Sequence, residues 1–227
     1  MILDRKTSPT IYSPQEFNYI LPPISSEQLD NGIPFYSLTD SVEPVLQLSM
    51  VFDAGLWYET KNAISQATAA LLKSGTSNLS SFQINDTFEQ YGASVKISTD
   101  ADWSVLTVSC LTKHLSKILP LVYELLTDTQ FPQSEIDIYV QNSKQKLSVQ
   151  LLKSEFIANR KIDEYIFGFE HPYGKYLFAT DYDAIRQEDL MAHLHKAYSS
   201  LNCKMFLAGM FTPSDKLLIN QIFGSSP

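Results

Sequence analysis

The chain of 227 residues has little of what small cross-linked, metal-bound or nucleotide-binding domains depend on. Its only two cysteines, Cys110 and Cys203, lie far apart, which argues against a disulfide framework and an all-cysteine metal site. Its eight glycines form no phosphate-binding loop, and no G-x-S-x-G nucleophile motif is present. A folded chain of this length buries about 70 % of its unfolded surface, so its core requires no cross-link.

Positive charge and long apolar runs are scarce as well. The 17 Lys and Arg residues against 25 Asp and Glu give a net charge of −8, which argues against nucleic-acid partners and anionic membranes. No apolar run reaches the length of a membrane-spanning helix, and the charged start, Met1–Lys6, precedes no signal-peptide core. Together with two free thiols, this predicts a cytoplasmic protein.

The sequence does contain the composition of a globular domain, with 44 % hydrophobic and 12 % aromatic residues. Prolines interrupt every regular pattern in residues 1–27, which we interpret as an irregular lead-in. No later stretch is rich in glycine or serine, so residues 28–224 are expected to form a single domain. Residues 225–227 are typical of the start of a linker.

The periodicity of apolar residues predicts strands that come in neighbouring pairs. The expected strands are 33–38, 45–53, 93–99, 103–111 and 204–211. The expected helices are 64–73, 80–92 with a Ser80 and Gln83 capping box, 115–126 with a kink at Pro120, 132–152, 155–167 capped by Ser154, 187–198 and 213–223. Paired strands favour an α+β class, an antiparallel sheet covered by helices.

Few residues suit catalysis. Two of the four histidines, His193 and His195, are two positions apart on an expected helix, so they point to different faces and cannot form a zinc pair. We expect both to be partly exposed. His114 at a helix start is expected to be solvated, and His171 to serve packing or a turn. Cys110 on an apolar strand is expected to be a core thiol.

Several strings, in order, resemble the pitrilysin/insulinase-like zinc peptidases. They are Leu29-Asp30-Asn31-Gly32, Val51-Phe52-Asp53-Ala54-Gly55, Leu71-Leu72-Lys73-Ser74-Gly75-Thr76, Phe88-Glu89-Gln90-Tyr91-Gly92-Ala93, Phe131-Pro132 and Phe167-Gly168-Phe169-Glu170-His171-Pro172-Tyr173-Gly174. The resemblance covers residue 28 to the C-terminus and is greatest to the N-terminal half of two-domain bacterial members. It implies a metallopeptidase half-clamshell fold.

Active members carry H-x-x-E-H on the first helix, where two histidines bind zinc and the glutamate is the general base. The resemblance places this motif on residues 66–70, where Gln66 and Ala70 replace the histidines and Ala69 replaces the base. The third ligand, a later glutamate, has no counterpart, since residues 138–154 contain neither Asp nor Glu. We therefore expect no catalytic residue, no metal and no cofactor, and expect Ala69 and Ala70 to pack in the core.

The resemblance implies a non-catalytic partner that forms part of a peptidase chamber, paired with a homologous catalytic subunit or with a second copy as a dimer. The alternative is a stand-alone peptide-binding or scaffold module, and an enzyme with relocated chemistry is the least favoured reading. In the family, the strand after the second helix is an edge that binds unfolded peptides by strand addition. The corresponding peptide-binding residues are Ala93, Ser94, Val95, Lys96 and Ile97.

Overall fold

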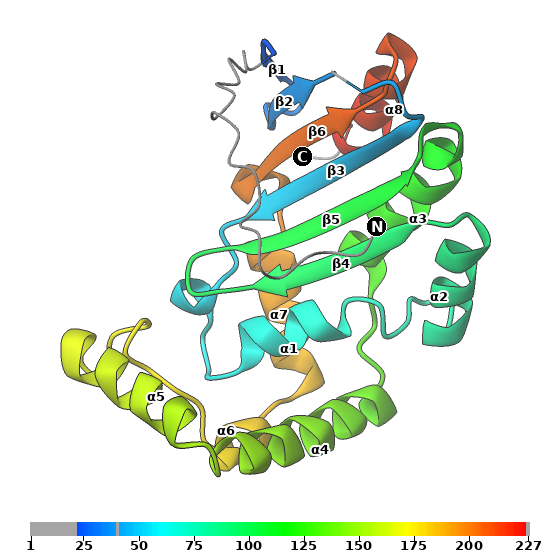
Figure 1. The fold of residues 1–227 in the computed structure, drawn as a ribbon. Helices are drawn as coiled ribbons and strands as arrows, with labels where there is room; N and C mark the ends of the chain where they lie inside the picture. Colours follow the sequence, from blue (N-terminus) through cyan, green and yellow to red (C-terminus); the bar gives the residue numbers. More distant parts are fainter. Residues whose placement is uncertain (1–21, 40, 226–227) are drawn as a thin grey trace, which may run out of the picture.

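The computed structural model of the protein describes residues 22–39 and 41–225, which are built around one β-sheet (Figure 1). Its strands are β1 (Ser25–Gln28), β2 (Pro34–Leu38), β3 (Val45–Phe52), β4 (Ser94–Thr99), β5 (Ser104–Leu111) and β6 (Cys203–Gly209). They lie in the order β1-β2-β6-β3-β5-β4, which puts β1 and β4 at the two edges. The expected α+β class is confirmed.

The sheet is antiparallel, as expected, except at one pair of strands. The last strand, β6, lies between β2 and β3, where it runs antiparallel to β3 but parallel to β2. The remaining pairs are antiparallel. The alternation of apolar residues in β6 shows which side chains are buried, but it carries no information on which distant strand becomes its neighbour.

Helices cover one face of the sheet, and the alternation within β3 explains which face. Leu46, Leu48, Met50 and Phe52 are buried, whereas the residues between them are exposed or half-buried. Behind this apolar face lie α3 (Leu115–Asp128), α7 (Gln187–Ala197) and α8 (Pro213–Phe223) (Figure 1). Burial of each apolar side chain of this size stabilises the folded state by about 1.5–3 kcal/mol. The sheet and these three helices therefore form the main hydrophobic core, which we call the body.

Two helices flank the β4 edge, and three more form the lower part of the molecule in Figure 1. They are α1 (Ile64–Leu71), α2 (Ser81–Gln90), α4 (Gln133–Gln150), α5 (Ser154–Phe167) and α6 (Ala179–Asp183). Single 3-10 turns occur at η1 (Leu56–Tyr58), η2 (Thr112–His114) and η3 (Ser200–Asn202). The capping box of Ser80 and Gln83 at the start of α2 is confirmed.

Several local expectations require correction. β1 begins at Ser25, inside the expected irregular lead-in, and α6 was not predicted. Ser154 is the first residue of α5 rather than its cap, and no side chain caps that helix. α3, by contrast, is present as expected, with Pro120 inside it. Residues 1–21 of the lead-in and residues 226–227 of the expected linker lie outside the described residues.

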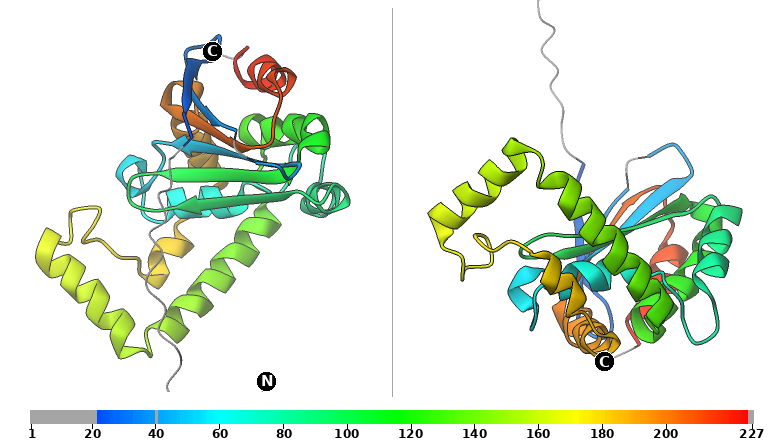
Figure 2. Two further views of the ribbon diagram at one scale, coloured as in Figure 1. Left: turned by 45° about the horizontal axis from the view of Figure 1, so that its top comes forward. Right: turned by 90° about the horizontal axis from the view of Figure 1, so that it is seen from below.

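α4 and α5 form an arm that projects away from the sheet (Figures 1 and 2). Phe131 lies two residues before the start of α4 and is fully buried, although its backbone has a φ of 49°. Only Ile136 and Leu147 are buried on α4, and no residue of α5 is. The exposed large apolar side chains of the arm are Ile138, Val149, Leu151, Leu152, Ile157, Ile162, Tyr165, Ile166 and Phe167. The arm thus rests on the body through few contacts.

None of the helices in the described part of the chain combines the length and the apolarity that crossing a membrane requires.

Candidate functional site

The helix that the resemblance assigns to zinc binding presents an exposed stripe with almost no ligand atoms. Gln66 and Ala70 are four positions apart and share one face of α1, and Lys73 follows one turn later. Gln66 is half-buried and Ala70 is exposed, whereas Ala69 is only 4 % exposed. The expectation of core packing is therefore confirmed for Ala69 and wrong for Ala70.

No alternative metal site takes the place of the missing motif in the described part of the chain. Within residues 22–39 and 41–225, no group of three or more His, Cys, Asp or Glu side chains could hold a metal ion. The α4 residues that share a hollow with Gln66 are Leu147 and Gln150, neither of which carries a carboxylate. Apart from the Glu59 carboxylate, which lines the same hollow, the side chains of Gln66 and Gln150 offer only neutral amides.

The edge strand β4 has backbone groups that point away from β5, the strand it pairs with among the described residues. The Asp100 backbone N–H donates to the Trp103 carbonyl at 3.0 Å, which makes this a hydrogen-bonded pair. Such pairs alternate along an antiparallel ladder. With the observed register, the backbone groups of Val95, Ile97 and Thr99 therefore point outward at the free edge.

One end of this edge is already occupied by a lysine. Lys73 Nζ donates to the Val95 carbonyl oxygen at 3.1 Å, and burial lowers the pKa of this amine. Among the predicted peptide-binding residues, Ala93 precedes β4, and the backbone groups of Ser94 and Lys96 are directed toward β5. The outward-facing groups at Ile97 remain open to an added strand, together with those at Thr99, which the sequence prediction omitted.

At its other end the edge is closed by η1. Leu56 N–H donates to the Asp100 carbonyl at 3.2 Å, and Trp57 N–H donates to the Ala101 carbonyl at 3.0 Å. Gly55 makes this approach possible, because a Cβ atom at this position would lie 2.5 Å from the Ala101 oxygen. The open part of the edge therefore covers only a few residues.

A hollow of about 290 Å³ lies between α1, α4 and α5 and contains several polar groups. Gln66, Gln150, Arg160, Lys175 and Glu59 are among its lining residues. The Glu59 carboxylate accepts hydrogen bonds from the backbone N–H and the hydroxyl of Ser65, at 3.2 and 3.0 Å. Burial nevertheless raises the pKa of Glu59, because removal from water disfavours the charged form of the carboxylate.

Three of the four histidines make packing contacts within the fold, and the fourth, His195, is exposed. The expectation of partial exposure holds for His195 but is wrong for His193, which is buried with Nε2 3.2 Å from the Ala54 carbonyl oxygen. Burial lowers the pKa of His193. His171 packs on Trp57, and its Nδ1 accepts a hydrogen bond from the backbone N–H of Tyr173. These contacts confirm the expected role in packing and in a turn. His114 is half-buried against an aromatic ring, not fully solvated as expected.

Both cysteines are free, buried thiols, which confirms the expectation of a core thiol for Cys110. Burial raises the pKa of Cys110 to about 11 and that of Cys203 to about 12. A thiol with so high a pKa is almost entirely protonated at neutral pH and is a weak nucleophile.

The sequence model of the insulinase family, peptidase family M16, matches residues 36–170. The chain belongs to this family. No curated protein matches the chain. The fold resembles a crystal structure described as a peptidase M16 inactive domain from Pseudomonas fluorescens, with a TM-score of 0.84 and 20 % identity over 90 % of this chain and 52 % of that one.

Two further solved M16-fold proteins resemble this chain. The periplasmic protease PqqL from Escherichia coli has a TM-score of 0.77 and 16 % identity, over 90 % of this chain and 24 % of that one. A mutant of the ferredoxin protease FusC, in complex with Arabidopsis ferredoxin, has a TM-score of 0.74 and 16 % identity, over 97 % of this chain and 27 % of that one. The chain spans about half the length, or less, of these structures.

Proposed function

We propose that this M16 domain is non-catalytic and forms part of a peptidase chamber whose chemistry resides in another domain or subunit. The observation that carries the proposal is the exposed stripe of α1, where Gln66 and Ala70 stand at the ligand positions and Ala69 at the position of the base. A catalytic zinc site requires three protein ligands and a polarised water. Alanine supplies no ligand atom, so neither requirement is met.

The length of the relatives supports a partner role. Two of the solved relatives are about twice as long as this chain, since it covers 52 % and 51 % of them. We propose residues 28–224 as one structural unit of such an assembly. The partner we expect is a homologous catalytic subunit or a second copy of this chain, in the cytoplasm.

A second candidate function, a stand-alone peptide-binding or scaffold module, is favoured by the geometry of β4. Its free edge offers the backbone groups of Ile97 and Thr99 beside the exposed stripe of α1. Backbone pairing requires no particular side chain on the peptide, so this mode does not depend on the lost zinc ligands. We expect an unfolded peptide to bind there only as a short strand, because Lys73 and η1 restrict the edge.

Affinity purification of the intact protein from its native cells, with mass spectrometry of the bound chains, tests the partner role. The proposal predicts a stoichiometric chain that carries H-x-x-E-H. Recovery of this protein alone, under conditions in which other known complexes are retained, would favour the stand-alone module. Chelator-sensitive peptide cleavage by the purified protein would contradict the non-catalytic role itself.

A further inference from the structure

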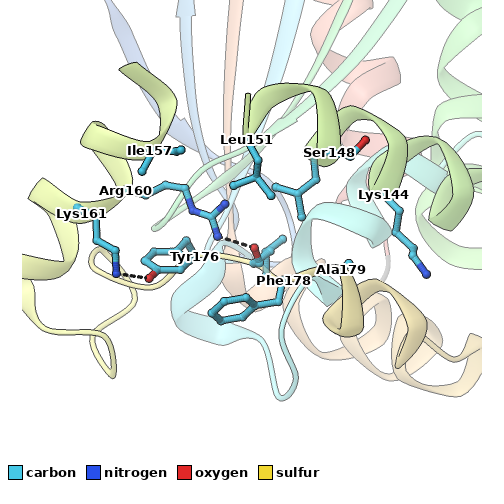
Figure 3. A pocket seen from close by; sticks show the side chains of 11 residues that line it. Lys144, Ser148, Leu151, Ile157, Arg160, Lys161, Tyr176, Phe178 and Ala179 are labelled. Carbon is cyan, nitrogen blue, oxygen red and sulfur yellow. Dashed lines mark hydrogen bonds between the residues drawn. The ribbon is translucent and has the colours of Figure 1, made fainter. Parts of the chain in front are cut away.

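An apolar hollow between α4, α5 and the segment before α6 contains a cation, Arg160, whose hydrogen bonds are only partly satisfied (Figure 3). The hollow has a volume of about 330 Å³, which is at the small end of the range for ligand sites. Its lining includes Leu147, Leu151, Ile157, Tyr176 and Phe178, which leave the surface mostly apolar. Arg160 lies among them.

The Arg160 guanidinium is held in place but only partly satisfied. Its Nη2 donates to the Leu177 carbonyl oxygen at 2.8 Å, and its Cζ lies 4.0 Å from the centre of the Tyr176 ring. Its Nη1 is buried and has no hydrogen-bond partner among the described residues. None of the ion pairs in the described part of the chain includes this arginine. A buried unpaired donor on a charged group is costly, and a ligand that pairs with it recovers that cost.

The neighbouring lysines indicate that the ligand carries a single negative charge. Lys144 pairs with Asp183 at 2.6 Å, and Lys161 pairs with Glu164 at 2.7 Å and also donates to the Tyr176 hydroxyl. Among the three cations that line this hollow, Arg160 is therefore the one without a carboxylate partner in the described part of the chain. A carboxylate fits the planar fork of a guanidinium with two hydrogen bonds, whereas a phosphate would leave further charged oxygens against apolar walls.

The adjoining hollow indicates that this carboxylate belongs to a peptide. The two hollows share Leu147, Arg160, Tyr176 and Leu177. The second hollow leads to Gln66 on α1 and is lined by amide and charged groups that suit peptide N–H and C=O groups. A hydrocarbon chain would leave these polar groups without partners.

We propose that the arm binds the C-terminal end of a peptide whose last residue is large and apolar. Its side chain fills the hollow beside Leu151 and Ile157, and its carboxylate pairs with Arg160 once the guanidinium turns its free Nη1 toward it. The preceding residues extend through the second hollow toward Gln66. This inference rests on the proposed chamber role and specifies a peptide end that the chamber holds.

The test is the fluorescence anisotropy of a labelled Gly-Ser-Ala-Ala-Leu peptide with the full chain, as the free acid and as the C-terminal amide. We expect the acid to bind about 10- to 100-fold more tightly, as for a hydrogen-bonded charge pair. Arg160→Gln should reduce the affinity for the acid to that for the amide. Lys146→Gln removes an exposed cation of α4 that lies outside both hollows, so it should change neither affinity.

Two further measurements keep the test decisive. Arg160→Lys retains the positive charge but not the planar guanidinium, so it should lose part of the preference for the free-acid peptide. Circular dichroism checks that each variant is folded. Equal binding of acid and amide, or no binding of either, would overturn the inference, as would equally tight competition by decanoate. Cleavage of either peptide, inhibited by a chelator, would instead contradict the proposed non-catalytic function.

Discussion

Mutation of Phe131, just before the α4–α5 arm, can separate two opposing contributions to stability. One is the burial of its side chain, and the other is the strain of its backbone. Its side chain is fully buried, while its backbone has a φ of 49°, in the left-handed region. Removal of a buried phenylalanine side chain costs about 3–5 kcal/mol, and the left-handed backbone costs a non-glycine residue about 1–2 kcal/mol. The gain from burial exceeds the backbone cost, which explains why a large apolar residue occupies this position.

This reasoning predicts an inverted order of the two smallest replacements. Phe131→Ala loses the side chain and keeps the strained backbone, so it should cost about 3–5 kcal/mol. Phe131→Gly relieves the backbone strain, but the greater freedom of glycine in the unfolded chain costs about 0.5–1 kcal/mol. The glycine variant should therefore be more stable than the alanine variant by about 0.5–1 kcal/mol. At Leu119, buried in the ordinary helix α3, glycine should instead be about 1 kcal/mol less stable than alanine.

Urea unfolding monitored by circular dichroism measures these differences, provided that the slope with denaturant is the same for all variants. If Phe131→Ala is as stable as Phe131→Gly or more stable, the backbone at this position is not strained and the argument is refuted. An unchanged stability of both variants would show that the side chain does not anchor the arm.

The remaining predictions concern the lost zinc site, the sheet edge and one buried acid. Restoring the motif with Gln66→His, Ala69→Glu and Ala70→His should yield no zinc-dependent cleavage in a casein assay, because residues 138–154 still supply no carboxylate as third ligand and Ala69 is too buried for glutamate. Lys73→Met frees the Val95 carbonyl, so sedimentation velocity should reveal concentration-dependent self-association; unchanged sedimentation would show that the lysine does not protect the edge. Because the pKa of Glu59 is raised above 4.5 by burial, its contribution to stability is greatest below pH 4.5 and falls as pH rises through the folded-state pKa. Glu59→Gln should abolish this loss of unfolding free energy with rising pH. An identical pH dependence of unfolding in the unmodified protein and the variant would contradict this prediction.

The sequence predicts the elements of this fold well, because burial on one face imposes a regular pattern. The alternation in β3 and the capping box at Ser80 gave correct elements at nearly correct positions. The neighbour of β6 was not predictable, because the parallel pair with β2 joins segments from opposite ends of the chain. β1 was missed because all of its side chains are exposed and carry no alternation.

The candidate site was predictable only as far as its residue types allow. The absence of His, Asp and Glu from the zinc positions of α1 follows directly from the sequence, and the strand expected at the edge does lie there. The bond from Lys73 to Val95 and the unpaired nitrogen of Arg160 depend on where long side chains end in space. No periodicity or spacing records such contacts, so only the three-dimensional structure reveals them.

The most direct test of the central claim is the zinc content of the purified protein after incubation with excess zinc and removal of the unbound metal. The absence of the two histidines from α1 and of a carboxylate from residues 138–154 predicts less than about one tenth of a zinc ion for each chain, which is the background of adventitious binding. One tightly bound zinc ion for each chain, lost on substitution of Gln66, would contradict the account of this domain as a non-catalytic member of its family.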